Sequence, residues 1–237
     1  MNITPRNEFL GGIRAELPIL VGVIPFGMIY GALALSAGIP ANASQAMSAI
    51  VFAGSSQFVM AQLWAQETPI FVMLATVFVV NLRHGLYSAS VAPYIQHLSI
   101  TWKGALSYLL TDEAYAVVIT HYRKFSQDAK DLSSIITGKQ HFFFLGAGLA
   151  LWSTWQISTA IGIFLGSIIP ESWSLDFTLT LTFIALVMPS LKRKPEIIAA
   201  LVGGIVAVIG AALPLKLGLL SGALAGILAG LWSERLK

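Results

Sequence analysis

The sequence predicts an all-α integral membrane protein, a bundle of seven or eight transmembrane helices, some of them broken or bent. Of its 237 residues, 56% are hydrophobic and only 11% are charged, whereas soluble domains carry about 25% charged residues. The runs Leu17–Gly38 and Ile197–Leu215 contain no charged residue and are long enough to approach or cross a bilayer. We expect one membrane domain over residues 1–237.

The expected helices follow one another through short connections. They cover residues 16–38, 42–65, 69–97, 104–122, 140–169, 172–191, 195–213 and 214–233. The helices at 69–97 and 140–169 exceed the roughly 20 residues of one crossing, so each is tilted, bent or partly outside the bilayer. Gly85 and Pro93 favour a bend or unwinding in the first of these two, and Pro25 does so in the first helix.

Basic residues set the expected orientation. With the N-terminus in the cytoplasm and eight crossings, eleven Lys and Arg residues fall on the inner side, and only Lys103 and Lys216 fall outside. Loops rich in Lys and Arg stay in the cytoplasm. We therefore expect a multi-pass protein of a bacterial inner membrane with both termini cytoplasmic.

Small residues suggest how the helices pack. Gly31–Pro40 resembles Gly162–Pro170, and both segments run outward in this topology, which would make a parallel repeat. Glycines also recur every four residues in the last helix, a spacing that lets helix backbones approach closely. They are Gly218, Gly222, Gly226 and Gly230.

The composition excludes several kinds of site. There is no cysteine, so disulfides, thiolate catalysis and Cys-based zinc sites are excluded. We expect no metal, no cofactor and no catalytic residue. The basic residues are spread over short loops and form no patch for nucleic acid. No GxxxxGK[ST] phosphate-binding loop occurs, so we expect no direct use of ATP by this chain.

A polar cluster inside an apolar run is the strongest functional signal. Asn81, Arg83 and His84 lie between Pro69 and Ile95, and an arginine near mid-membrane costs roughly 2.5–3.5 kcal/mol on insertion scales. Asn81 and His84 share a helix face, with Arg83 on the adjacent one. We expect this cluster to hold a polar substrate, an ion or a broken helix.

Polar groups in three other expected helices complement it. Gly54, Ser55, Ser56 and Gln57 offer close backbone approach, donors and acceptors. Asp112 and Glu113 point about 100° apart on a helix, so one can pair with Arg83 while the other titrates or faces a watery cavity. The break expected at Pro25-Phe26-Gly27 would free backbone groups for an ion or a carboxylate; a simple kink is the alternative.

Four ordered segments resemble the AzlC/YgaZ family of branched-chain amino acid exporters. They are Pro18–Gly27, Phe52–Phe58, Asn81–Ser88 and Leu110–Ala116. The resemblance is carried by residues 10–125. It implies export of valine, leucine, isoleucine and often methionine, and a small membrane subunit of the AzlD/YgaH kind that is required for activity.

These residues fit a zwitterionic substrate. Arg83 or the first-helix break would take the carboxylate, and Asp112 or Glu113 would take the ammonium group or a coupled proton. Aromatic residues would form the apolar wall, and the serines, Gln57 and Asn81 would orient the substrate. The aromatic candidates are Phe26, Phe52, Phe58 and Trp152.

Three other functions are compatible with the sequence. An intramembrane hydrolase would use Ser55 or Ser56 with His84 as the base, but no distinctive nucleophile elbow surrounds these serines. A scaffold would only hold a partner subunit. An importer would use the same residues as an exporter, because sequence does not give the direction of flux.

Overall fold

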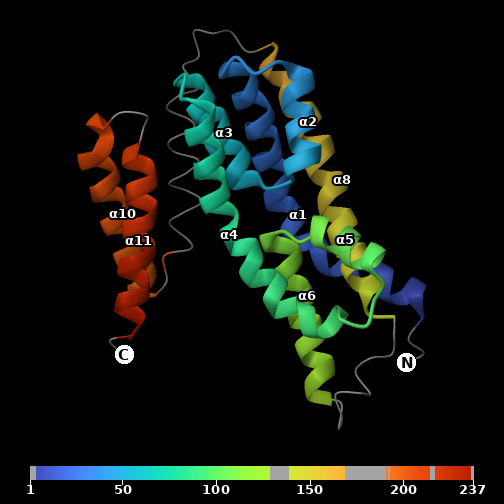
Figure 1. The fold of residues 1–237 in the computed structure, drawn as a ribbon. Coiled ribbons are helices and arrows are strands. Elements are labelled where there is room, and N and C mark those ends of the chain that lie inside the picture. Colours follow the sequence, from blue (N-terminus) through green and yellow to red (C-terminus); the bar gives the residue numbers. More distant parts are fainter. Residues whose placement is uncertain (1–3, 129–138, 169–190, 192, 214–216, 236–237) are drawn as a thin grey trace. The chain divides into compact units, whose positions relative to one another are not determined.

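The computed structural model describes residues 4–128, 139–168, 191, 193–213 and 217–235, and every regular element in these ranges is helical (Figure 1). The elements are α1 (Pro5–Ser36), α2 (Ala41–Val51), α3 (Gly54–Ala65), α4 (Ile70–Ile95), α5 (Ile100–Tyr108), α6 (Asp112–Asp128), α8 (His141–Gly166), α10 (Lys194–Ile209), the 3-10 turn η2 (Gly210–Ala212) and α11 (Leu217–Arg235). This confirms the all-α membrane bundle.

The chain forms two compact units, which are described separately. Unit 1 comprises Met1–Leu35, Ile39–Phe58 and Asn81–Ile168, and unit 2 comprises Ser36–Gly38, Val59–Val80 and Ile169–Lys237. Whether they act as the single predicted domain stays a prediction.

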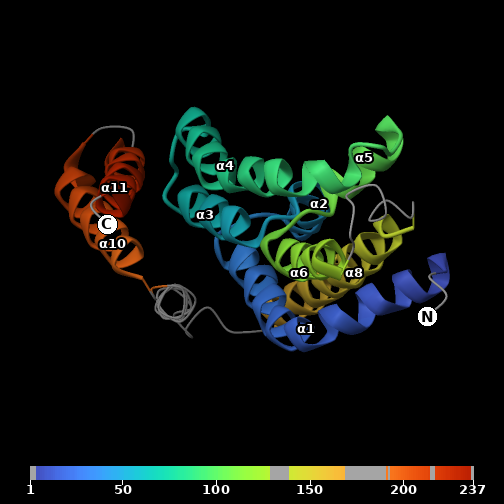
Figure 2. The same ribbon diagram turned by 90° about the horizontal axis from the view of Figure 1, so that it is seen from below.

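The frame of unit 1 is the close parallel packing of α1 and α8 (Figure 2). A Cβ atom at Gly12 would lie 2.0 Å from the carbonyl oxygen of Phe143, and one at Gly31 would lie 2.4 Å from that of Thr159. Contacts therefore advance in the same direction along both helices, and backbone meets backbone where a side chain would not fit. We call the side where α1 and α8 begin the near side, and the side where they end the far side.

Helices α2 and α3 form a hairpin that enters and leaves on the far side. The hydroxyl of Tyr30 in α1 donates to the carbonyl oxygen of Ser44 in α2. One turn further along α2, the hydroxyl of Ser48 is hydrogen-bonded to that of Thr159 in α8. The chain turns at Phe52, whose backbone is left-handed with φ of 43° and ψ of 46°. Helix α3 then returns toward the far side, since Phe58 again packs on Tyr30.

Helices α5 and α6 form a second hairpin that enters from the near side. Trp102 of α5 packs on His141 at the start of α8, whereas Leu109 reaches Gly148 deeper in the bundle. The chain turns over Leu109–Thr111, and α6 brings His121 back to Glu8 near the start of α1. The tips of the two hairpins therefore meet inside the bundle from opposite sides.

This topology differs from the expected crossings. Residues 42–65 and 104–122 are each split by a break, as the prediction of broken helices allowed, but each forms a hairpin instead of a crossing. Each hairpin precedes a long helix that starts on the hairpin's own side, α4 or α8. The two hairpins therefore form an inverted arrangement. The repeat expected between Gly31–Pro40 and Gly162–Pro170 concerns α1 and α8, which run parallel as expected; whether they form a true repeat stays a prediction.

Two predicted breaks are absent. Helix α1 continues through Pro25, and α4 continues through Gly85 and Pro93. A proline still removes one amide donor from each helix, but neighbouring turns keep the helix intact. The expected helix at 172–191 lies outside the described residues.

Five described helices are long and apolar enough to cross a membrane, namely α1, α4, α8, α10 with η2, and α11. In unit 2, the glycines of α11 pack on α10: a Cβ at Gly222 would lie 2.7 Å from the carbonyl oxygen of Gly203, and one at Gly226 would lie 2.7 Å from that of Ala199. The predicted glycine ladder is thus internal packing of this helix pair.

Candidate functional site

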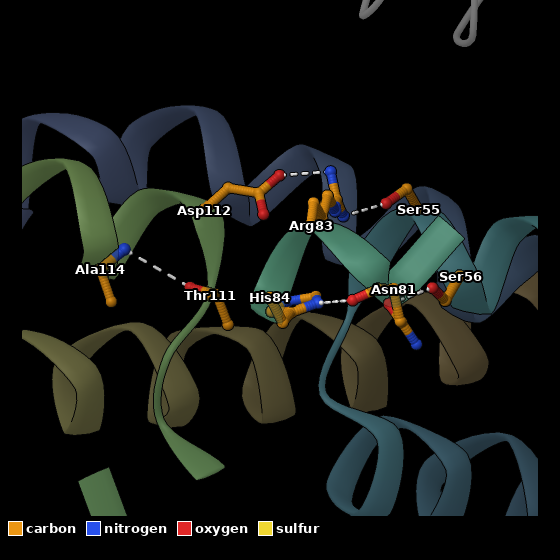
Figure 3. Close-up of polar contacts among 8 residues, drawn as sticks. All are labelled: Ser55, Ser56, Asn81, Arg83, His84, Thr111, Asp112 and Ala114. Atoms are coloured by element: carbon orange, nitrogen blue, oxygen red, sulfur yellow. Dashed lines mark hydrogen bonds and ion pairs between the residues drawn. The ribbon is translucent and has the colours of Figure 1, made fainter. Parts of the chain in front are cut away.

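Arg83 of α4 joins the tips of the two hairpins (Figure 3). Its Nη1 donates to Asp112 Oδ2 at 2.5 Å, and its Nη2 donates to the hydroxyl of Ser55. Ser55 opens α3 and Asp112 opens α6. One guanidinium therefore holds groups that belong to opposite sides of the bundle.

The pair of Arg83 and Asp112 retains unused bonding capacity. The two side chains are 33% and 37% exposed, yet Arg83 Nε and Asp112 Oδ1 are buried and have no hydrogen-bond partner among the described residues. A buried polar atom without a partner is costly. A small ligand or water that supplies an acceptor and a donor would satisfy both atoms.

Asn81 and His84 form a second polar layer on α4. The hydroxyl of Ser56 donates to Asn81 Oδ1 at 2.6 Å, and His84 Nδ1 lies 3.2 Å from the carbonyl oxygen of Asn81. One turn further, Tyr87 stacks on Tyr115 of α6 with ring centroids 4.5 Å apart. Helix α4 thus contacts both returning half-helices along one continuous stripe.

Both polar motifs occupy the first turn of a half-helix that starts inside the bundle. Ser55, Ser56 and Gln57 lie at the start of α3, and Asp112 and Glu113 lie at the start of α6. The first four amides of a helix lack intrahelical acceptors and carry a partial positive charge. The breaks at Phe52 and at Leu109–Thr111 therefore create two electropositive ends beside Arg83, which suits an anionic group.

An aromatic wall lies behind the tip of the far hairpin. Phe26 stacks on Phe58 at 4.5 Å and meets Trp155 edge-on at 5.7 Å. A Cβ at Gly54 would lie 3.1 Å from both Phe26 and Trp155, so a larger residue would push these rings apart by a few tenths of an ångström. Gln57 is fully buried beside Tyr30.

The structure brings most predicted residues together but changes several details. Pro25 lies on an exposed face of an unbroken helix, so the unwound segment expected there is absent, and a binding role for Pro25 stays a prediction. Trp155 completes the wall with Phe26, whereas Trp152 instead donates to the hydroxyl of Tyr108 at 2.6 Å. Phe52 is buried against the same tyrosine.

Sequence reasoning missed two acids of α1. Glu16 is fully buried, and Glu8 is 8% exposed and lies 2.9 Å from His121. Glu8 precedes the helix expected at 16–38, and Glu16 is the first residue of that helix. Their spacing of eight residues, which places them on one helix face, was the available signal.

Paired half-helices that meet around charged side chains inside an apolar bundle define a multi-pass integral membrane protein with an internal polar site. The chain belongs to the AzlC protein family, whose model matches residues 18–169. This confirms the resemblance seen in the four sequence segments, all of which lie within the match.

Relatives are found in bacteria and archaea. The inner membrane protein YgaZ of Escherichia coli is 28% identical over 84% of this chain and 81% of its own. An uncharacterized membrane protein of Archaeoglobus fulgidus is 31% identical over 87% and 86%, and the branched-chain amino acid transport protein AzlC of Bacillus subtilis is 26% identical over 85% and 77%. No solved structure shows significant similarity to the chain.

Proposed function

We propose that this chain is the large subunit of a secondary transporter that exports valine, leucine and isoleucine, with methionine as a further substrate. It is coupled to protons and works in the bacterial cytoplasmic membrane with a small AzlD/YgaH-like membrane subunit. Membership of the AzlC family, together with the name of the Bacillus subtilis relative, a branched-chain amino acid transport protein, supports the substrate class. The observation that carries the proposal is the position of Arg83 between two half-helix ends.

The site matches the groups of a branched-chain amino acid. The substrate carboxylate binds Arg83 and the amide groups that open α3, where positive charge is concentrated. Its ammonium group binds Asp112, whose Oδ1 lacks a partner. Its branched side chain packs on the wall of Phe26, Phe58 and Trp155, while Ser56 and Asn81 orient the polar end.

The hairpin topology also supports cytoplasmic termini. Lys103 was one of the two basic residues on the wrong side of the eight-crossing arrangement. In the structure α5 begins on the near side, which places Lys103 with the basic residues around the start of α1 and the end of α6. They include Arg6, Arg123, Lys124 and Lys139. No Lys or Arg occurs from residue 15 to residue 82, which contains the far hairpin, so the near side is the cytoplasmic one.

The geometry gives no support to a hydrolase. The hydroxyl of Ser55 accepts from Arg83, and that of Ser56 donates to Asn81. A serine nucleophile needs a base within hydrogen-bond reach, and neither serine is hydrogen-bonded to His84 among the described residues. We therefore propose no enzymatic activity.

Efflux measurements test the proposal. Cells are preloaded with leucine-containing dipeptides, and leucine efflux is measured with and without this chain and its small subunit. Wild type should raise efflux, Arg83→Ala and Asp112→Asn should abolish the increase, and Arg123→Ala, an exposed arginine outside the site, should not. Equal efflux in all strains would end the transporter proposal, a gain in uptake alone would make the chain an importer, and lost assembly without any flux would indicate a scaffold.

A further inference from the structure

Helix α1 contains a buried acid that the proposed substrate site does not use. Glu16 has no exposed surface, and neither of its carboxyl oxygens has a hydrogen-bond partner among the described residues. An ionised carboxylate without donors is very unfavourable in an apolar interior. Glu16 is therefore suited to hold a proton.

Glu113, the second residue of α6, occupies the position that corresponds to Glu16. It lies eight residues before His121, and Glu16 lies eight residues after Glu8, the residue of α1 that His121 contacts. Because α1 and α6 are antiparallel, Glu16 and Glu113 are at the same level of the bundle. The residue before Glu113 in the chain, Asp112, is paired with Arg83. Helix α8, which also packs on α1, contributes no ionisable residue except His141 at its start.

Two neighbouring carboxyl groups in an apolar bundle favour the state in which one of them is protonated over the state in which both are ionised. Like charges this close resist simultaneous ionisation, and intramembrane acids are typical of proton relays. Asp112 is different, because Arg83 holds it as an ion pair at 2.5 Å. The division of roles is therefore clear: Asp112 belongs to the substrate site, and Glu113 belongs with Glu16.

A second acid–base pair lies on the same face, nearer the cytoplasm. Glu8 Oε2 is 2.9 Å from His121 Nε2, and the His121 ring stacks on Phe143 with centroids 3.6 Å apart. Helices α1 and α6 are antiparallel, so a step of eight residues forward along α1 and eight back along α6 leads from the pair of Glu8 and His121 to the pair of Glu16 and Glu113. At 1.5 Å per residue, the two pairs are about 12 Å apart along the helix axis.

We propose that Glu16 and Glu113 together form the proton-binding site of the transporter, and that Glu8 and His121 connect it to the cytoplasmic side. This inference rests on the proposed function as a secondary transporter. A proton from hydronium ion adds to a carboxylate oxygen of the acid pair, and the same O–H bond breaks when the proton is released to water. Water carries the proton over the interval between the two pairs.

The test separates proton coupling from transport itself. The full chain and its co-expressed small subunit are reconstituted in vesicles, and labelled leucine is followed in two modes: exchange without a pH gradient, and net movement driven by a pH gradient. Glu16→Gln and Glu113→Gln should keep exchange and lose the gradient-driven component. Glu67→Gln, at an exposed turn, should keep both.

Gradient-driven transport in Glu16→Gln equal to that of Glu67→Gln would overturn the proton site while leaving the transporter proposal intact. Absence of exchange in wild type would instead overturn the transporter. A second readout is independent of transport. Infrared difference spectra of wild type at neutral pH should show a protonated-carboxyl band that shifts in D2O and is lost in Glu16→Gln; a band unchanged in both glutamine variants would refute the site.

Discussion

Replacing Gly162 by alanine should loosen the frame formed by α1 and α8. A Cβ at this position would lie 2.0 Å from the carbonyl oxygen of Met28 and 2.7 Å from its Cα. The two backbones must separate by about 1 Å to reach even a tight contact of about 3.0 Å, which real Cβ atoms rarely go below. Neither atom belongs to a flexible side chain, so rotamer changes cannot relieve the clash.

Overpacking of this kind costs about 1–3 kcal/mol, while alanine gains up to about 1 kcal/mol over glycine in a helix. The net loss of unfolding free energy should therefore be about 1–2 kcal/mol. The assay is equilibrium unfolding of the purified protein by SDS in mixed micelles, followed by circular dichroism.

Gly22→Ala is the matched control, because nothing lies within 4 Å of a Cβ built there. The same chemical change on the same pair of helices should then be neutral or slightly stabilising, since only the helix propensity remains. If Gly162→Ala and Gly22→Ala unfold at the same SDS fraction, the close contact of α1 and α8 is refuted.

Three further predictions concern the site and the topology. Arg83→Lys should abolish leucine efflux nearly as fully as Arg83→Ala, since one ammonium does not reproduce the fork that holds Ser55 and Asp112 together; efflux at the wild-type rate would contradict the bridging role. Ser56→Ala removes a single hydrogen bond to Asn81, worth about 0.5–1.5 kcal/mol, and should weaken leucine binding several-fold in a direct binding assay without abolishing transport. Since the natural chain has no cysteine, Lys103→Cys can be labelled alone: an impermeant maleimide should react only in inside-out vesicles, and labelling of intact cells would support the eight-crossing arrangement instead.

The long helices could be predicted from sequence because apolar length is a direct consequence of bilayer thickness. The ends of α1, α4 and α8 and the starts of α4 and α8 agree with the expected segments to within three residues, whereas α1 begins at Pro5, eleven residues before the expected start. The hairpins could not be predicted in this way, since two half-helices of 11 and 12 residues have the summed length and hydropathy of one crossing. The contacts of Ser48 with Thr159 and of Phe58 with Tyr30 show that the chain turns back at Phe52.

The candidate site was partly predictable because lipid penalises unpaired charge. Arg83 was expected to pair with one of the two neighbouring acids, Asp112 and Glu113, and it pairs with Asp112. The bond to Ser55 could not be derived, because it depends on where α2 stops, and Phe52 is not a residue that marks a break. Because residues 42–65 form a hairpin and not a crossing, α4 runs in the direction opposite to the expected one. The second hairpin, at 104–122, restores the expected direction of α8, so the expectation of a cytoplasmic N-terminus is unchanged.

The left-handed backbone of Phe52 stores conformational strain at the tip of the far hairpin. A residue with a Cβ in this conformation costs roughly 1–2 kcal/mol, and glycine would adopt it freely. The cost is offset by burial of the ring, which is only 5% exposed and packs on Tyr108. Packing of the Phe52 ring on Tyr108 thus holds the tip of the far hairpin in a strained backbone conformation. Loss of the contact between the Phe52 ring and Tyr108 would release the roughly 1–2 kcal/mol that this backbone conformation costs.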